Sequence, residues 1–297
     1  MTEPDHTMPP LSRWHADGRT IALRGRVGPH MIFTRQDGPV DGLPVTLVHG
    51  FPTSSHDWAP VVPQLAAAGF RVTTLDLLGF GNSDKPRRHV YSITEQADLV
   101  ESLWDELGID RTALVAHDYG VSVAQELLAR RPERITRMAW LNGGLYADLH
   151  RPLLVQRLLH GPLGPLLSRA VTRRGFRSSM RRVLGRPVAD ADLDTMWTAI
   201  SAANGHLLAH RLLRYIDDRR THQARWVHAL ETYPGPVAFV WGPADPISGA
   251  HVLARIRERM PHAAIDELSE PPAVGHYPQV EAPEAVAGHL VSFLSAG

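Results

Sequence analysis

One stretch of the sequence, residues 113–120, constrains the fold more than any other. The apolar run Ala113-Leu114-Val115 has the composition of a buried strand and leads into a turn at Asp118. A helical pattern then begins at Tyr119 and continues through Leu128. A strand, a sharp turn with one reactive side chain and a helix form the pattern that presents a nucleophile at the end of a sheet strand. The reactive residue here is a carboxylate, where serine is usual.

Length and composition set broad limits on the function. The 297 residues are enough for one large α/β domain with an insertion or for two ordinary domains. The formal net charge of zero favours neither nucleic acid nor an acidic partner, so we expect no nucleic-acid binding. There are no cysteines, which excludes disulfides and thiolate metal sites. The 17 histidines are scattered and never take His-Glu-x-x-His spacing, so we expect no metal and no cofactor.

The sequence shows no sign of membrane insertion or export. The first residues, Met-Thr-Glu-Pro-Asp-His, lack the basic and apolar regions of a signal peptide. No run approaches the ~18 apolar residues of a spanning helix. These features predict a cytoplasmic protein.

Strand-like and helical patterns alternate along most of the chain. Short runs between residues 20 and 35 predict an antiparallel hairpin that opens the sheet. Alternation of this kind predicts an α/β fold with a mostly parallel sheet and right-handed crossovers. The predicted strands are 44–49, 71–76, 112–117, 137–142, 237–241 and 263–268, and the predicted helices are 60–68, 92–107, 119–130, 250–259 and a last one after Pro283.

The alternation stops between about residues 144 and 234. This block is helical and loop-rich, and it falls late in the sheet domain, where a cap above the strand ends would be inserted. We call residues 144–234 the cap segment. The predicted organisation is an α/β core formed by residues 1–143 and 235–297, with a loose arm at residues 1–12.

Polar residues follow several of the predicted strands. In a parallel sheet, functional groups collect beyond the carboxyl ends of the strands. Asp118, Asp245 and His276 occur in the chain order nucleophile, acid, histidine that is typical of α/β-hydrolase triads. The segments concerned are His49-Gly50-Phe51-Pro52, residues 76–86, Asp118, residues 241–246 and Gly275-His276-Tyr277-Pro278.

These motifs resemble an α/β-hydrolase of the epoxide hydrolase and haloalkane dehalogenase branch, and within it most of all the mesoderm-specific transcript proteins. The resemblance covers nearly the whole chain. The matching patterns are His-Gly-Phe-Pro-Thr-Ser-Ser at 49–55, Leu-Gly-Phe-Gly-x-Ser-Asp-Lys-Pro at 78–86, His-Asp-Tyr-Gly at 117–120, Asn-Gly-Gly at 142–144, Arg-Pro-Leu-Leu at 151–154, Tyr-Ile at 215–216, Arg-Trp-Val at 225–227 and His-Tyr-Pro-Gln at 276–279.

The residues themselves suggest a two-step hydrolysis. Asp118 attacks a saturated carbon and forms an alkyl ester, and His276, oriented by Asp245, activates the water that cleaves it. The backbone N–H groups of Phe51 and Tyr119 are the expected oxyanion donors. The alternative for Asp118 is an ordinary helix N-cap.

The position of the acid stays open, and two more histidines need an assignment. Some relatives place the acid after the preceding strand, which here ends in Asn142 and has Asp148 further along. We expect His49 and His117 to shape loops through hydrogen bonds rather than to react.

The resemblance implies two candidate reactions. Haloalkane dehalogenases hold the halide with a Trp that follows the nucleophile, usually together with an Asn in the oxyanion motif or a second Trp. In this sequence Tyr119 follows Asp118, and Phe51 occupies the position in the oxyanion motif. Epoxide hydrolases protonate the epoxide oxygen with cap tyrosines, and Tyr215 and Tyr146 are the candidates for that role. The leading prediction is therefore hydrolysis of a lipophilic epoxide by water. Dehalogenation is the enzymatic alternative, and a binding or membrane-associated scaffold is the alternative of another class.

The cap segment is unusually basic. Residues 149–189 contain nine arginines and no Asp or Glu. Such a surface could rest on an anionic membrane, while the simpler interpretation is a solvated face balanced by acids elsewhere. The sequence predicts no oligomeric state.

Overall fold

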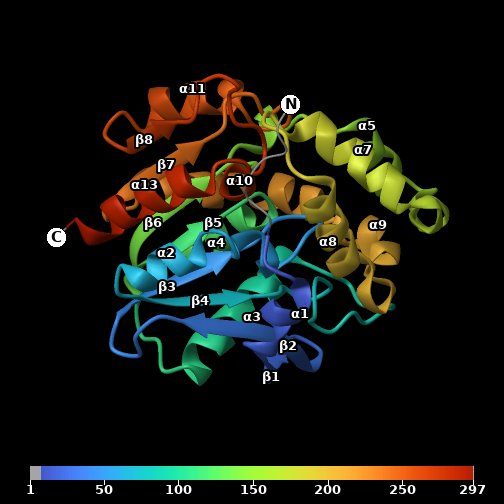
Figure 1. The fold of residues 1–297 in the computed structure, drawn as a ribbon, viewed down its shortest axis with the longest axis horizontal. Helices are drawn as coiled ribbons and strands as arrows, with labels where there is room; N and C mark the ends of the chain where they lie inside the picture. Colours follow the sequence, from blue (N-terminus) through green and yellow to red (C-terminus); the bar gives the residue numbers. More distant parts are fainter. Residues whose placement is uncertain (1–7, 297) are drawn as a thin grey trace.

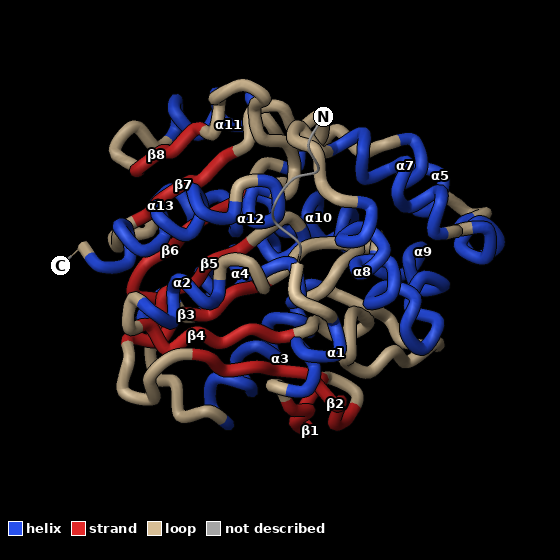
Figure 2. The backbone as a smooth tube through the Cα atoms, viewed as in Figure 1, coloured by secondary structure: helices blue, strands red, loops and turns tan. Residues whose placement is uncertain are grey.

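An eight-stranded sheet lies at the centre of the protein (Figure 2). The computed structural model describes residues 8–296. The strand order is β1-β2-β4-β3-β5-β6-β7-β8; β2 pairs antiparallel with β1 and with β4, and every other neighbouring pair is parallel. The predicted mostly parallel sheet with an antiparallel opening hairpin is therefore confirmed. The strands are β1 (Arg19–Gly25), β2 (Gly28–Asp37), β3 (Leu43–Val48), β4 (Phe70–Leu75), β5 (Thr112–Ala116), β6 (Ile135–Leu141), β7 (Val237–Trp241) and β8 (Ala264–Glu267).

Helices cover both faces of the sheet. Leu65 of α2 and Leu290 of α13 belong to the apolar cluster on one face, while Leu103 of α3 and Leu127 of α4 belong to the cluster on the other. The stripe on α3 forms because apolar residues recur at helical spacing after the N-cap Ser92, whose hydroxyl accepts from the backbone N–H of Glu95. The core helices are α1 (Leu11–Ala16), α2 (Val62–Ala67), α3 (Ile93–Glu106), α4 (Tyr119–Arg130), α11 (Ala250–Arg259), α12 (Pro278–Glu281) and α13 (Pro283–Ser295).

The chain between β6 and β7 forms helices at one end of the sheet. The parallel strands point their carboxyl ends toward these helices; α5, α7, α8 and α9 lie on the right in Figure 1, and α10 lies near the centre. The longest of them, α10, packs against α4, the helix that follows Asp118. None of the helices in the described part of the chain is long and apolar enough to cross a membrane. The helices are α5 (Leu154–His160), α6 (Gly164–Leu167), α7 (Arg173–Val183), α8 (Asp190–Ser201), α9 (Ala209–Leu212) and α10 (Tyr215–Thr232).

The expected loose arm at residues 1–12 needs correction in its second half. Residues 1–7 lie outside the described part of the chain. Met8 is buried in an apolar cluster with residues of α7 and α8, and its backbone N–H donates to Asp192 Oδ1 at 2.8 Å. Leu11 then begins helix α1. A buried methionine and a hydrogen bond thus hold this part of the arm against the cap segment, a contact that its polar composition did not indicate.

Candidate active site

Asp118 lies in the turn between β5 and α4, with a backbone φ of 45°. Few residues other than glycine adopt this left-handed conformation, and at functional sites it reflects strain held in place by the surroundings. The backbone N–H of Asp118 donates to the Asn142 carbonyl at 2.9 Å, which fixes the turn to the end of β6. Gly120 makes the close approach possible, because a Cβ there would lie 2.6 Å from the Val48 carbonyl oxygen.

Asp118 is only 4% exposed, and its carboxylate accepts a hydrogen bond from one backbone donor. Phe51, which follows β3, donates its backbone N–H to Asp118 Oδ2 at 3.0 Å. Tyr119 is the first residue of α4, and the first N–H groups of a helix have no partner within the helix. The positive end of the α4 dipole also favours negative charge at this position. Oδ2 is thus held by the Phe51 N–H, while Oδ1 is the carboxylate oxygen that faces His276.

His276 lies between two carboxylates. Its Nδ1 hydrogen-bonds with Asp245 Oδ2 at 2.8 Å, and its Nε2 lies 3.8 Å from Asp118 Oδ1. Asp245 also accepts from the backbone N–H of Ile247 at 2.8 Å and from the Ser248 hydroxyl at 2.6 Å. The structure therefore brings Asp118, His276 and Asp245 together in the geometry of a nucleophile, a base and an orienting acid.

The negative charges of Asp245 and Asp118 keep His276 cationic at neutral pH. Burial alone would lower the pKa of His276, but the Asp245 and Asp118 carboxylates raise it to about 9. Burial would raise the pKa of Asp245, but His276 and the Ser248 hydroxyl lower it to about 2. The Asp118 charge is therefore one of the contributions that keep the imidazole protonated.

Two polar residues that the sequence did not single out as catalytic hold this triad in place. Asn142, at the end of β6, donates to Asp245 Oδ2 at 3.1 Å and to the Gly242 carbonyl at 2.8 Å. His117 hydrogen-bonds through Nε2 to the His276 carbonyl at 2.7 Å. Burial lowers the pKa of His117 to about 4, which keeps the ring neutral at physiological pH. His49 likewise accepts the backbone N–H of Leu77 at 3.0 Å and contacts the neighbouring loop.

Tyr215, the first residue of α10, packs against Tyr119 and Phe51 from the cap segment. Its ring is buried, with centroids 5.0 Å from Tyr119 and 6.4 Å from Phe51. Burial and the Asp118 charge raise the pKa of its phenol, so the hydroxyl stays protonated. Tyr215 thus carries a neutral phenol close enough to Asp118 for the Asp118 charge to act on it.

A buried arginine one helical turn after Tyr215 contacts the elbow. Arg219 donates from Nη2 to the Asp118 carbonyl at 2.9 Å and from Nε to the Ser122 hydroxyl at 2.6 Å. Its guanidinium carbon lies 4.4 Å from the centroid of the Tyr215 ring. Among the described residues it pairs with no carboxylate. The spacing of four residues places Tyr215 and Arg219 on one helix face, which is the signal that could have found Arg219.

Tyr146 does not join the site, contrary to the expectation from the sequence. Its hydroxyl donates to Glu231 Oε1 at 3.3 Å, and Arg255 packs over its ring. Neither Tyr146 nor Tyr215 lines the cavity beside the triad, but Tyr146 lines a second pocket together with Glu231 and Arg255. The ion-pairing side chains between the C-terminal half of α10 and α11 hold the hydroxyl there, although Tyr146 follows β6 closely in sequence.

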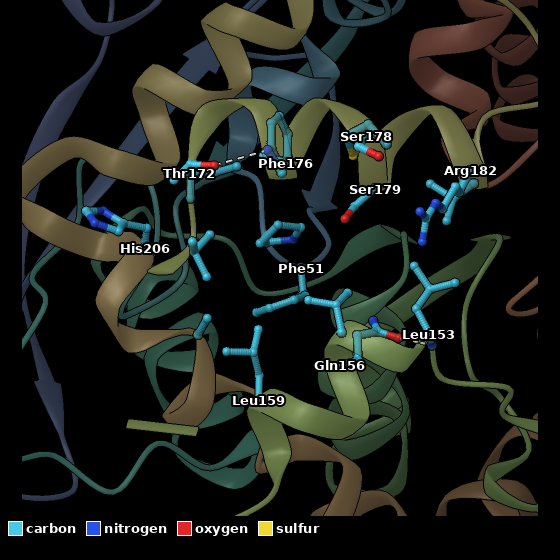
Figure 3. Close-up of a pocket in the computed structure, with 18 of the residues that line it drawn as sticks. Phe51, Leu153, Gln156, Leu159, Thr172, Phe176, Ser178, Ser179, Arg182 and His206 are labelled. Carbon is cyan, nitrogen blue, oxygen red and sulfur yellow. Dashed lines mark hydrogen bonds between the residues drawn. The ribbon is translucent and has the colours of Figure 1, made fainter. Parts of the chain in front are cut away.

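A cavity of about 410 Å³ lies between the core and the cap segment. Figure 3 views it between α5, which carries Gln156 and Leu159, and α7, which carries Phe176 and Ser179. Most of the lining side chains are apolar, and His276 and Phe51 border the cavity at the triad. The arrangement suits a lipophilic molecule whose reacting group meets the triad.

One group of side chains in the described residues has metal-ligand geometry, His30, His89 and Glu95. Glu95 already accepts from the Arg26 backbone N–H at 3.1 Å and hydrogen-bonds with His89 at 2.5 Å. None of the three side chains lines the cavity or touches the triad. A metal bound there would therefore take no direct part in chemistry at Asp118.

Comparisons with known proteins agree with this architecture. The family of the alpha/beta hydrolase fold matches residues 44–283. The mesoderm-specific transcript protein of Mus musculus is 39% identical over 309 residues, which cover 99% of this chain and 90% of that protein. The resemblance predicted from the motifs is therefore confirmed.

Two more distant relatives are named for two different reactions. A cis-3-alkyl-4-alkyloxetan-2-one decarboxylase of Shewanella oneidensis is 27% identical over 266 residues, which cover 86% of this chain and 82% of that protein. The crystal structure of haloalkane dehalogenase DbeA from Bradyrhizobium elkani superposes with a TM-score of 0.78 at 25% identity, covering 94% of this chain and 99% of that one.

Proposed function

Because the chain belongs to the α/β-hydrolase fold family, we propose that it hydrolyses a lipophilic epoxide through a covalent ester on Asp118. The observation that supports this most is the contact set of the Asp118 carboxylate. Oδ2 accepts the Phe51 N–H at 3.0 Å, and Oδ1 lies 3.8 Å from Nε2 of a histidine that Asp245 orients. A carboxylate nucleophile suits attack at saturated carbon, because the ester that it forms can be cleaved by water.

In the first step, Asp118 Oδ1 attacks one carbon of the epoxide and the bond from that carbon to the ring oxygen breaks. The developing alkoxide takes the proton of the Tyr215 phenol and becomes a hydroxyl group. Solvent then returns a proton to the phenolate. The raised pKa of Tyr215 supports this role, because the proton is present at neutral pH.

In the second step, His276 Nε2 removes a proton from water as the water oxygen attacks the ester carbonyl. The oxyanion that forms is the former Oδ2, next to the backbone N–H groups of Phe51 and Tyr119. Collapse of this intermediate breaks the bond between the carbonyl carbon and the former Oδ1, which leaves with the product as an alkoxide. This alkoxide takes the proton from His276, which releases the diol. The Asp118 carboxyl group, which now carries the water oxygen, loses its remaining proton to solvent and becomes a carboxylate again.

Halide displacement fits the contacts less well. The Tyr119 side chain is buried, and its hydroxyl lies beside the Gln96 side chain rather than facing a leaving atom. Phe51 offers only its backbone N–H, which Asp118 Oδ2 already takes. Neither side chain supplies the N–H donors that dehalogenases use to hold a halide.

A second candidate substrate is an oxetan-2-one, a four-membered ring that is also a strained cyclic oxygen compound. The relative named for such a substrate aligns with 86% of this chain. Opening at the saturated carbon would release a carboxylate, which is a better leaving group than an alkoxide and needs no proton. Tyr215 is the one tyrosine positioned beside Asp118 from the cap segment of the described structure, so a reaction that needs little protonation also suits this site.

The proposal is tested by trapping the ester. A His276→Gln variant, incubated with panels of lipophilic epoxides, oxetan-2-ones and haloalkanes, should gain the mass of one substrate on the peptide that carries Asp118. The double variant Asp118→Asn/His276→Gln is the control and should gain none. Absence of an adduct across the panels, with Asp118→Asn leaving any measured activity unchanged, would exclude Asp118 as the nucleophile.

A matched pair of tyrosine variants separates the substrate classes. Tyr215→Phe should slow adduct formation from epoxides about 10²-fold or more, the usual contribution of a positioned proton donor. It should affect oxetan-2-ones much less. Tyr146→Phe removes a phenol outside the cavity and should leave both rates unchanged. Equal effects of the two variants would contradict the role of Tyr215.

A further inference from the structure

Exposed apolar side chains gather on one edge of the cap segment. Of the ten large apolar residues exposed in the described chain, five lie on or next to α5 and α6. Their exposed fractions reach 68% at Leu154, 64% at Leu163 and 62% at Leu166. A group of this kind within thirteen residues is unusual for a surface that faces only water. The five are Leu154, Val155, Leu158, Leu163 and Leu166.

The same edge carries positive charge that acids neutralise only in part. Residues 149–189 hold nine arginines and no Asp or Glu. Three of these arginines pair with Asp190 or Asp194 of α8, and Arg186 bonds to backbone carbonyls. The other five have no carboxylate partner among residues 8–296. They are Arg151, Arg157, Arg169, Arg174 and Arg182.

The apolar edge leads directly into the cavity. Val155 and Leu158 are exposed on α5 and also line the cavity. Arg182, on α7, lines it as well, and Figure 3 places it beside Leu153 on the far side from His206. Helices α5 and α7 lie side by side at the outer edge of the molecule (Figure 1). A partner that binds this edge therefore faces the cavity, which His276 also lines.

The geometry points to docking of this edge, which we call the α5–α7 face (residues 151–182), on the surface of an anionic lipid bilayer. The exposed leucines of α5 and α6 enter the interface, and the unpaired arginines bind lipid headgroups. The cavity then opens toward the membrane, from which a lipophilic substrate enters without crossing water. A second copy of the chain fits this face less well, because two such faces would place unpaired arginines against arginines.

Vesicle binding tests the docking without any knowledge of the substrate. The full-length protein is sedimented with vesicles of phosphatidylcholine alone or of phosphatidylcholine mixed with phosphatidylglycerol. Binding should require phosphatidylglycerol and should weaken as salt is added, because salt screens exposed charges. Equal binding to neutral vesicles, or no binding to anionic vesicles at low salt, would overturn the inference.

Variants on and off the face provide the matched controls. Arg169→Gln/Arg174→Gln should weaken binding about five-fold per arginine at low salt, and Leu163→Ser/Leu166→Ser should also weaken it. Control pairs on the distant β1–β2 edge and the loop after β2 remove the same charge or a similar apolar exposure and should have no effect. They are Arg19→Gln/Arg24→Gln and Val27→Ser/Val40→Ser.

Circular dichroism verifies that each variant keeps its fold, as expected for exposed substitutions. Light scattering then distinguishes the lipid from a protein partner. If the wild-type protein were a dimer that Leu163→Ser/Leu166→Ser converts to a monomer, and neither protein bound anionic vesicles, the face would be a protein interface and the inference would be wrong.

Discussion

The pair formed by His276 and Asp245 gives a prediction about stability whose sign depends on pH. The pKa of His276 is raised from its usual 6.5 to about 9 by the Asp245 carboxylate and by Asp118, against the effect of burial. At 1.36 kcal/mol per pKa unit, this shift corresponds to about 3 kcal/mol of folding free energy. Replacing Asp245 by Asn keeps the shape of the side chain but removes the charge that contributes most of the increase.

The sign follows from linkage. A histidine whose pKa is higher in the folded state contributes fully below the unfolded value of 6.5, and the contribution is lost as the pH rises through about 9. The stability difference between the wild-type protein and Asp245→Asn should therefore be largest near pH 6. It should then shrink by about 3 kcal/mol toward pH 10.

Urea unfolding of both proteins at several pH values between about 6 and 10 measures this difference. Ser248→Ala removes a hydrogen bond to the same carboxylate but no group that titrates in this range, so its effect should be independent of pH. In a His276→Gln background the pH-dependent part of the Asp245→Asn effect should vanish. A difference that stays constant from pH 6 to pH 10 would refute the argument that a His276 cation is stabilised in the folded site.

Three other variants test the contacts around the elbow. Asp118→Asn should lower the pKa of His276, measured by NMR, because it removes one of the charges that raise it. An unchanged pKa would mean that the Asp118 charge does not act on His276. Gly144→Ala should cost about 1–3 kcal/mol in thermal unfolding, since its Cβ would lie 2.2 Å from Arg219 Nη1. Arg219→Met should lose about 1–3 kcal/mol for each hydrogen bond removed and slow adduct formation, whereas Ser122→Ala, which removes one bond, should lose less. If the Arg219→Met variant were as stable as the wild-type protein, the free-energy cost of burying the guanidinium would equal the stabilisation from its hydrogen bonds, and the prediction would be wrong.

Local patterns predicted most of the fold. The apolar run of β5 and the helix after Asp118 could be recognised within a dozen residues, because strand and helix periodicities are local properties of the chain. The α/β alternation then required a parallel sheet, and the carboxyl ends of its strands had to meet at one edge. That geometric rule is why Asp118 and His276, 158 positions apart, could be predicted as neighbours from one sequence.

Contacts that depend on packing between distant helices could not be predicted in this way. Tyr146 follows β6 closely and was expected near the nucleophile, but its hydroxyl instead bonds with Glu231. Asn142 lacks the charge of an acid, and only the three-dimensional structure reveals that it donates to Asp245. Met8 was expected in a loose arm because the surrounding residues are polar, although its own side chain is buried against α7 and α8. In each case the deciding partner lies at least 80 positions away in the sequence.

The position of α10 connects the cap segment to the reaction itself. Tyr215 and Arg219 lie one turn apart on the same helix face, so they reach the site as one rigid unit. In the proposed reaction Tyr215 offers a proton to the leaving oxygen, while Arg219 donates to the carbonyl of Asp118, whose left-handed backbone needs support. A shift of α10 would therefore change the proton donor and the nucleophile together. In the proposed reaction the cap segment would therefore do more than select the substrate by shape. A movement of its other helices that shifts α10 would also change the support that Arg219 gives to the Asp118 backbone.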